Sequence, residues 1–231
     1  ANITSIDAIN TSEVTMANAT VNVTDQVTKT QADAINSYTT GQVTLTSIAD
    51  TLNNLSSINS LPDSEVMMQM ASLTVTDTAT LANANTVNEF TTNQVTLNSI
   101  SDTLLNLSSI DSINTSEVTM GTAEVNVLDT VTLANANTIN AYTTGQVTLN
   151  SISDTSANLA TLDAIDNAEV TIGTAEVNVL DTVTLANANT INAYTTGQVT
   201  LTSISDTFAN ITSIDAINTS EVTMANATVN V

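Results

Sequence analysis

The sequence predicts an α/β solenoid, a stack of coils that each hold a short helix and parallel strands. One observation is a tandem repeat, because the aspartates that begin the coils are alternately 25 and 27 residues apart and two coils make a 52-residue unit. The other is the pattern inside each coil, where apolar residues recur at every third position and then alternate with polar ones. Repetition at periods of about 20 to 50 residues is typical of solenoids. The aspartates are Asp25, Asp50, Asp77, Asp102, Asp129, Asp154, Asp181 and Asp206.

The stretch after each aspartate predicts a short helix or 3₁₀ segment. In the coil of residues 129–154 the apolar residues Leu133, Ala136 and Ile139 lie three positions apart. That step fits a 3₁₀ turn, or an α-helix with a wide buried face, better than it fits a strand. The preceding Asp-Thr pair predicts an N-cap, in which the carboxylate accepts from a backbone N–H two or three residues onward. We therefore assign the eight aspartates a structural role.

Glycine or asparagine follows each predicted helix in the 25-residue coils. The four positions are Gly41, Asn93, Gly145 and Gly197. Exchange of glycine for asparagine is typical of a left-handed residue just past a helix end. We therefore expect a left-handed backbone at these four structural positions.

The alternating stretch that comes next predicts a strand. Val118, Val147, Val170 and Val199 should be buried and stacked, with glutamate or glutamine outside. The 27-residue coils add a corner, such as residues 121–123, and a second strand. Because Thr, Val, Asn, Ile and Ser are mediocre helix formers, an all-β right-handed β-helix is the alternative fold.

The repeat predicts one continuous solenoid over residues 1–231, without a domain boundary. It divides into four units, 1–52, 53–104, 105–156 and 157–208, and a partial unit, 209–231. Residues 1–23 are identical to residues 209–231, so both ends lie at the same phase of the repeat. Solenoids normally carry distinct capping repeats. We therefore interpret the chain as a window of a longer protein.

Composition excludes several classes of function. The net charge is −22, with 23 acidic residues and Lys29 as the one basic residue, which argues against nucleic acid or an anionic membrane surface as a partner. No apolar run approaches the roughly 20 residues of a membrane helix, so we expect no membrane insertion. Without His, Cys or Arg, the usual nucleophile–base pairs and phosphate clamps cannot be assembled. We therefore expect neither an enzyme nor a bound cofactor.

The aspartate column has two interpretations. Helix capping is favoured. Calcium is the alternative, because it takes carboxylate oxygens, and its candidate ligands are Asp102, Asp129, Asp154 and Asp181. Under capping, Asp154→Asn should be mild, because asparagine caps about as well as aspartate. Under the calcium interpretation, the same change should abolish calcium-dependent stability.

The coil DTVTLANANTINAYTTGQVT, residues 129–148, resembles the tandem repeats of giant secreted cell-surface proteins of bacteria, particularly cyanobacteria. The swimming-associated surface protein of marine cyanobacteria is one of them. The spacing of the apolar residues also resembles that of leucine-rich repeats, whose asparagine ladder has no counterpart here. The residues that carry the first resemblance are Asp129, Thr130, Thr138, Ile139, Asn140, Thr143, Thr144, Gly145 and Val147.

These observations together predict a structural extracellular or cell-surface protein. Stacked coils would form a filament, a surface coat or a spacer, with copies of the chain as partners, end to end or laterally. The alternative is the repeat region of an adhesin, calcium-responsive in one version, or an ice-binding array. An ice-binding array would use a column of threonines such as Thr96, Thr148 and Thr200.

Overall fold

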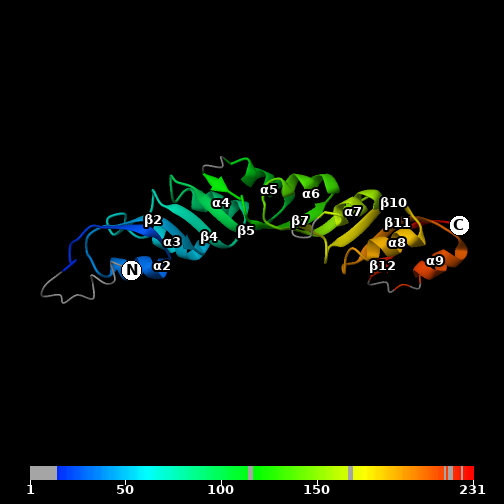
Figure 1. The fold of residues 1–231 in the computed structure, drawn as a ribbon, viewed down its shortest axis with the longest axis horizontal. Helices are drawn as coiled ribbons and strands as arrows, with labels where there is room; N and C mark the ends of the chain where they lie inside the picture. The colour runs from blue at the N-terminus through cyan, green and yellow to red at the C-terminus, as the bar shows by residue number, and fades with distance from the viewer. Residues whose placement is uncertain (1–14, 114–116, 166–168, 216, 218–220, 225) are drawn as a thin grey trace. The chain divides into compact units, whose positions relative to one another are not determined.

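The computed structural model describes residues 15–113, 117–165, 169–215, 217, 221–224 and 226–231 (Figure 1). It confirms the α/β solenoid, because short helices alternate with parallel strands in repeated coils. The chain forms two compact units, one of Ala1–Ile100 with Ser109–Met120 and the other of Ser101–Ser108 with Gly121–Val231. The boundaries of the 52-residue units, and their continuity as one array, stay predictions.

The helical segments are α-helices, each eight residues long, so the 3₁₀ and all-β alternatives are excluded. Poor intrinsic propensity is offset by a threonine N-cap and by two buried residues on the inner face, as Ala136 and Ile139 are in α6. In the described residues the helices are α2 (Lys29–Asn36), α3 (Leu52–Asn59), α4 (Leu81–Asn88), α5 (Leu104–Asp111), α6 (Leu133–Asn140), α7 (Ser156–Asp163), α8 (Leu185–Asn192) and α9 (Phe208–Asp215).

The strands of the first unit pair in parallel in the order β1-β2-β4-β5, with β3 also beside β2 and β6 also beside β5. Both β5 and α5 contribute residues to the two units. The bounds are β1 (Val21–Val27), β2 (Val43–Asp50), β3 (Val66–Met67), β4 (Ser72–Ala79), β5 (Val95–Asp102) and β6 (Val118–Thr119).

The strands of the second unit also pair in parallel, in the order β7-β8-β10-β11-β12, with β9 beside β8 and β13 beside β11. The bounds are β7 (Glu124–Val131), β8 (Val147–Asp154), β9 (Val170–Thr171), β10 (Glu176–Val183), β11 (Val199–Ser205), β12 (Val222–Thr223) and β13 (Thr228–Asn230).

The predicted corner of the 27-residue coils divides one strand into two. The start of β8 pairs with the short strand β9, Val147 opposite Val170, and the end of β8 pairs with β10, Ser151 opposite Glu176. The corner between β9 and β10 therefore carries the chain past the middle of β8.

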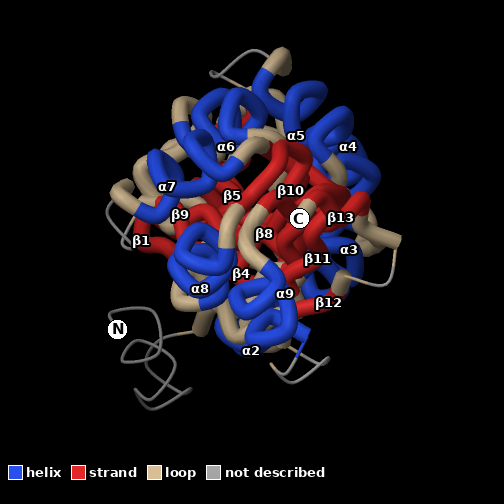
Figure 2. The backbone as a smooth tube through the Cα atoms, turned by 90° about the vertical axis from the view of Figure 1, so that its right-hand side faces the viewer, coloured by secondary structure: helices blue, strands red, loops and turns tan. Residues whose placement is uncertain are grey.

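The core lies between the sheet and the helices of each unit, which lie outside the strands (Figure 2). The predicted valines are buried: Val118 and Val170 are 2% exposed, and Val147 and Val199 are 0% exposed. The opposite sheet face carries half-buried threonine, serine and asparagine. Each unit is therefore a two-layer structure with one open polar face.

Candidate functional site

The aspartates at the strand ends of the 25-residue coils bind to two coils at once. Asp154, at the end of β8, accepts on Oδ1 from the backbone N–H of Thr155 at 2.8 Å and the side-chain amide of Asn158 at 2.7 Å. Its Oδ2 accepts from the backbone N–H of Leu133 at 2.8 Å. Leu133 is the first residue of α6 in the preceding coil, so this carboxylate joins neighbouring coils. We call such a bond an inter-coil cap.

The same arrangement recurs along the chain. Asp50 Oδ2 accepts from the backbone N–H of Lys29 in the preceding coil at 2.7 Å, and Asp206 Oδ2 accepts from the backbone N–H of Leu185 at 3.0 Å. The bonds within the aspartate's own coil are those of Asp50 to Thr51 and Asn54, Asp102 to Thr103 and Asn106, and Asp206 to Thr207 and Asn210.

The aspartates of the 27-residue coils make simpler inter-coil caps. Asp129 Oδ1 accepts from the backbone N–H of Leu104, 25 residues earlier, at 2.8 Å. Asp77 binds Leu52 in the same way at 2.9 Å. Asp181 accepts from both the backbone N–H and the hydroxyl of Ser156, each at 2.7 Å. Asp25 lies at the same phase and is exposed.

The cap within each helix's own coil is threonine, not aspartate. Thr155 has an extended backbone, and its hydroxyl accepts from the backbone N–H of Asn158 at 3.4 Å. The predicted bond from the aspartate to an N–H two or three residues onward is therefore wrong. The mild effect expected for Asp154→Asn stays untested, but this geometry leads us to expect a larger one, because an asparagine amide nitrogen cannot accept the N–H of Leu133.

The hydrogen bonds decide the charge of these carboxylates. Burial raises the pKa of Asp154, but the bonds from Leu133, Asn158 and Thr155 stabilise the charged form and hold that pKa below its usual range. Burial also opposes ionisation of Asp50, and bonds from Asn54, Lys29 and Thr51 again lower its pKa. These aspartates are therefore anionic at neutral pH without a basic residue beside each one.

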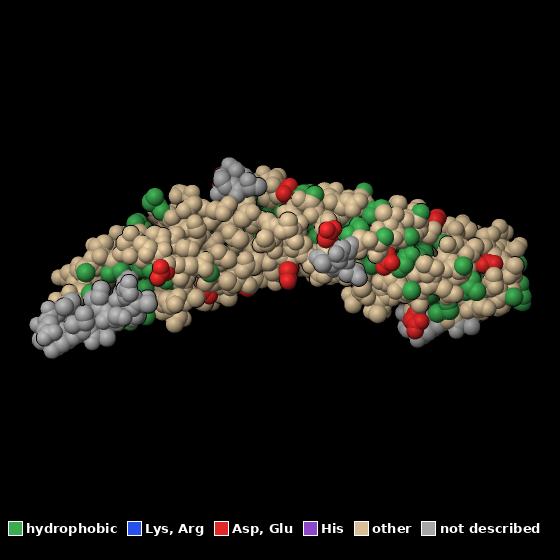
Figure 3. All heavy atoms as spheres, viewed as in Figure 1, with side chains coloured by type: hydrophobic (Ala, Val, Ile, Leu, Met, Phe, Trp, Pro, Cys, Tyr) green, Lys and Arg blue, Asp and Glu red, His purple; other side chains and the backbone are tan. Residues whose placement is uncertain are grey.

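The calcium candidates lie in this network. Asp102 and Asp154 are 7% and 8% exposed, and N–H donors engage the oxygens that calcium would need. Within the described residues, no three acidic side chains gather closely enough to hold a metal ion. On the face shown in Figure 3 the acidic side chains lie singly, separated by uncharged atoms. Calcium binding stays an untested prediction.

The glycine turns serve a different purpose from the one predicted. In the described residues no residue has a positive φ, so the left-handed assignment is wrong. A Cβ on Gly145 would lie 2.2 Å from the carbonyl oxygen of Ala123 in the preceding corner. Gly41 and Gly197 meet the same obstacle. In these three coils the close approach of two backbones leaves no room for a Cβ in the present geometry.

Asn93 replaces this glycine in one coil and keeps the turn. Its backbone N–H donates to the hydroxyl of Thr91 at 3.0 Å, as that of Gly145 donates to Thr143 at 2.9 Å. Its side-chain amide donates to the carbonyl of Met70 at 3.2 Å, in the corner of the preceding coil. A polar side chain that bonds to the corner is therefore accommodated.

Sequence reasoning missed the buried threonine before each turn. Thr143 is 7% exposed, donates to the carbonyl of Ala123 at 2.7 Å and accepts from Gly145. The signal was present, since threonine precedes all four turns. The other copies are Thr39, Thr91 and Thr195.

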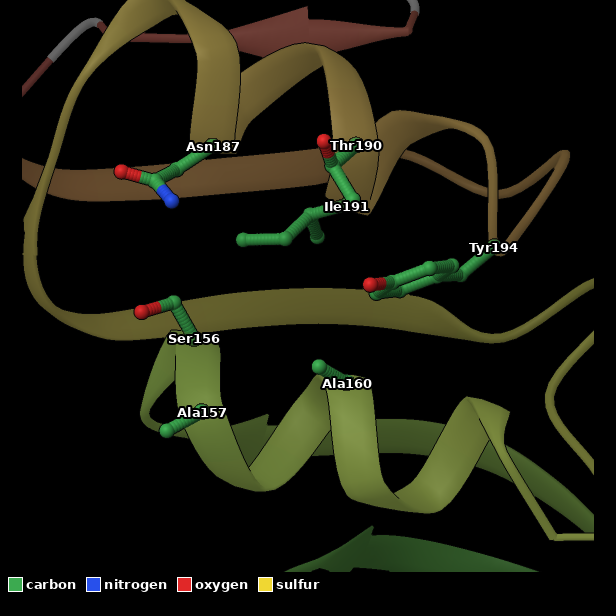
Figure 4. A pocket seen from close by; sticks show the side chains of 7 residues that line it. All are labelled: Ser156, Ala157, Ala160, Asn187, Thr190, Ile191 and Tyr194. Atoms are coloured by element: carbon green, nitrogen blue, oxygen red, sulfur yellow. The ribbon is translucent and has the colours of Figure 1, made fainter.

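A groove of about 280 Å³ lies between α7 and α8 (Figure 4). The α7 wall consists of Ser156, Ala157 and Ala160. The corresponding residues on α5 are Leu104, Leu105 and Ser108. There the hydroxyl of Ser108 lies 3.1 Å from that of Tyr142, and this contact bridges the helices. Smaller side chains on α7 therefore open the groove.

The other wall combines polar and apolar groups. It consists of Asn187, Thr190 and Ile191 of α8 and Tyr194 just past its end. Because Ala160 replaces the serine, the bridge to Tyr194 has no counterpart. Partial burial raises the pKa of Tyr194, and the Asp163 carboxylate adds to the effect, so the phenol is protonated at neutral pH.

No protein-family model, curated protein or solved structure matches this chain. Among the described helices, none is both long and apolar enough to cross a membrane.

Proposed function

We propose that this chain is a structural repeat segment of an extracellular or cell-surface protein, which forms a filament, a surface coat or a spacer by stacking coils. The inter-coil caps carry the proposal. Asp129, Asp154 and Asp181 each hold the helix of the coil before them. Any number of coils can be joined through such bonds, because the carboxylate of each coil accepts from the helix of the coil before it, and its own helix donates to the coil after it.

The surface supports the same function. Its charge is almost entirely negative, which keeps a long array soluble through self-repulsion. Copies of the chain are the proposed partners, end to end or laterally, and nucleic acid and membrane interiors are not. Catalysis and a resident cofactor form no part of the proposal.

The ice-binding alternative has less support. Thr148 pairs with Thr171 on one side but with Asn126 on the other, so the column is not made of threonine alone. Thr148 and Thr171 are also half-buried. The adhesin alternative is favoured by the groove between α7 and α8, since adhesion requires a recognition site.

Two measurements test the structural proposal. Antibodies against the chain, followed by electron microscopy of the producing cells, should label extracellular filaments or the cell surface. Recombinant proteins of two to six 52-residue repeats should lengthen in proportion to repeat number and melt at rising temperature, as nearest-neighbour coupling requires. Cytoplasmic labelling, or a melting temperature independent of repeat number, would contradict the proposal.

A further inference from the structure

We propose that the groove between α7 and α8 binds one ring of a neutral saccharide. The α7 wall of the groove differs from the corresponding face of α5. Glu117–Thr155 and Glu169–Thr207 are nearly identical, yet the helix before α6 carries Leu104 and Ser108 where α7 carries Ser156 and Ala160. The opening therefore comes from local replacements rather than from the general packing of the solenoid.

The polar groups of the groove fit hydroxyl groups. The Asn187 carbonyl oxygen accepts from the backbone N–H and hydroxyl of Thr184 at 3.2 and 2.9 Å, which leaves its NH₂ to donate. The Thr190 hydroxyl donates to Ala186 and keeps acceptor capacity. The Tyr194 hydroxyl points into the space between the helices (Figure 4) and can both donate and accept.

The apolar groups fit the CH face of a sugar ring. Ile191, only 2% exposed, lies at the back of the groove, with Ala157 and Ala160 opposite. The Tyr194 ring supplies a larger apolar surface that carries a polar tip. The lining places a few polar groups among apolar contacts, as in ligand sites. Its volume of about 280 Å³ is just below the usual range for such sites and suits one ring rather than a longer chain.

Charge argues against anions and metal ions as ligands of the groove. No acidic or basic side chain lines the groove, and Asp163 is near enough to act on Tyr194. An anion would be repelled by this carboxylate and by the net charge of −22. A metal cation would find no carboxylate ligand in the lining. A neutral polyhydroxylated ring satisfies both conditions.

The test is an NMR titration of the whole chain with glucose, galactose, mannose and N-acetylglucosamine, with neutral polysaccharides of the same sugars, and with glucuronate as the charged control. We expect saturable shifts at Thr190, Ile191 and Tyr194 with at least one neutral sugar, and weaker shifts with glucuronate. Binding by a polysaccharide alone supports the proposal and identifies a polymer as the source of the ring. No saturable shift with any neutral sugar or polysaccharide overturns it.

Variants show whether the groove is the site. Ser156→Leu with Ala160→Ser copies α5 and should fill the groove, lowering affinity by about tenfold or more. The variant loses the hydroxyl bond of Ser156 to Asp181 but keeps the backbone one, and circular dichroism should show that the fold is kept. Tyr194→Phe removes one hydroxyl and should weaken binding without filling the space. Ser108→Ala, on α5, is the matched control and should bind as the parent does. Unchanged affinity in both groove variants overturns the proposal, and it leaves the structural function untouched, since that depends on the inter-coil caps.

Discussion

Asp154→Asn should destabilise the second unit far more than Asp129→Asn. Asp154 accepts three hydrogen bonds, and asparagine can keep the two on Oδ1 from Thr155 and Asn158. It loses the bond from Leu133 and turns an NH₂ toward that N–H. A hydrogen bond to a charged group contributes about 1.5–3 kcal/mol, and two facing donors add to the loss. We expect a cost of about 2–3 kcal/mol.

Asp129→Asn is the matched control because the asparagine carbonyl can accept the single bond from Leu104. Its cost should stay below about 1 kcal/mol, close to that of an ordinary neutral hydrogen bond. Thermal melts should show a fall of about 4–12 °C for Asp154→Asn at this chain length, and a much smaller fall for the control. Hydrogen exchange should show lost protection at the Leu133 amide.

Equal effects of the two substitutions would refute the inter-coil cap. Melts with calcium and with chelator decide the competing interpretation. A calcium-specific rise in melting temperature that sodium does not reproduce and Asp154→Asn abolishes would show that the column binds calcium.

Three further predictions follow from the turns and from the charges. Gly145→Val should lower the free energy of unfolding by about 3 kcal/mol, because its Cβ would meet the backbone of Ala123. Gly145→Asn should cost less, because Asn93 occupies the same position in another coil. Equal urea midpoints for the two variants would contradict this. Thr143→Val should lower the free energy of unfolding by about 1–3 kcal/mol, since buried Ala123 and half-buried Gly145 lose their bonds. Exposed Thr144→Val should cost less in the same urea denaturation, and the reverse order would argue against the buried threonine. The free energy of unfolding should be level above about pH 4 and fall in more acidic solution. The pKa values of Asp50 and Asp154 are lowered in the folded chain, so the stability they contribute is lost as the pH falls through those values. A flat profile of melting temperature from pH 7 to 2 would contradict this prediction.

The tandem repeat and the alternation of helix with strand were predictable from the sequence. Periodicity encodes which side of a segment is apolar, and burial of that side selects helix or strand. For this reason the valines at Val147 and Val199 were correctly placed in the core. The three-residue spacing could not distinguish an α-helix from a 3₁₀ turn. The capping threonines and the tertiary packing select the α-helix.

Only the tertiary structure shows which groups the repeated aspartates and glycines contact. Asp154 meets Leu133 across 21 residues and Asp129 meets Leu104 across 25, and no pattern within one coil reports such a contact. Gly145 is needed for the backbone of Ala123, again in another coil. The groove beside Tyr194 likewise depends on which helix lies opposite. Local sequence sets the shape of a coil, but the distance between two coils is fixed only when they stack, and these interactions depend on that distance.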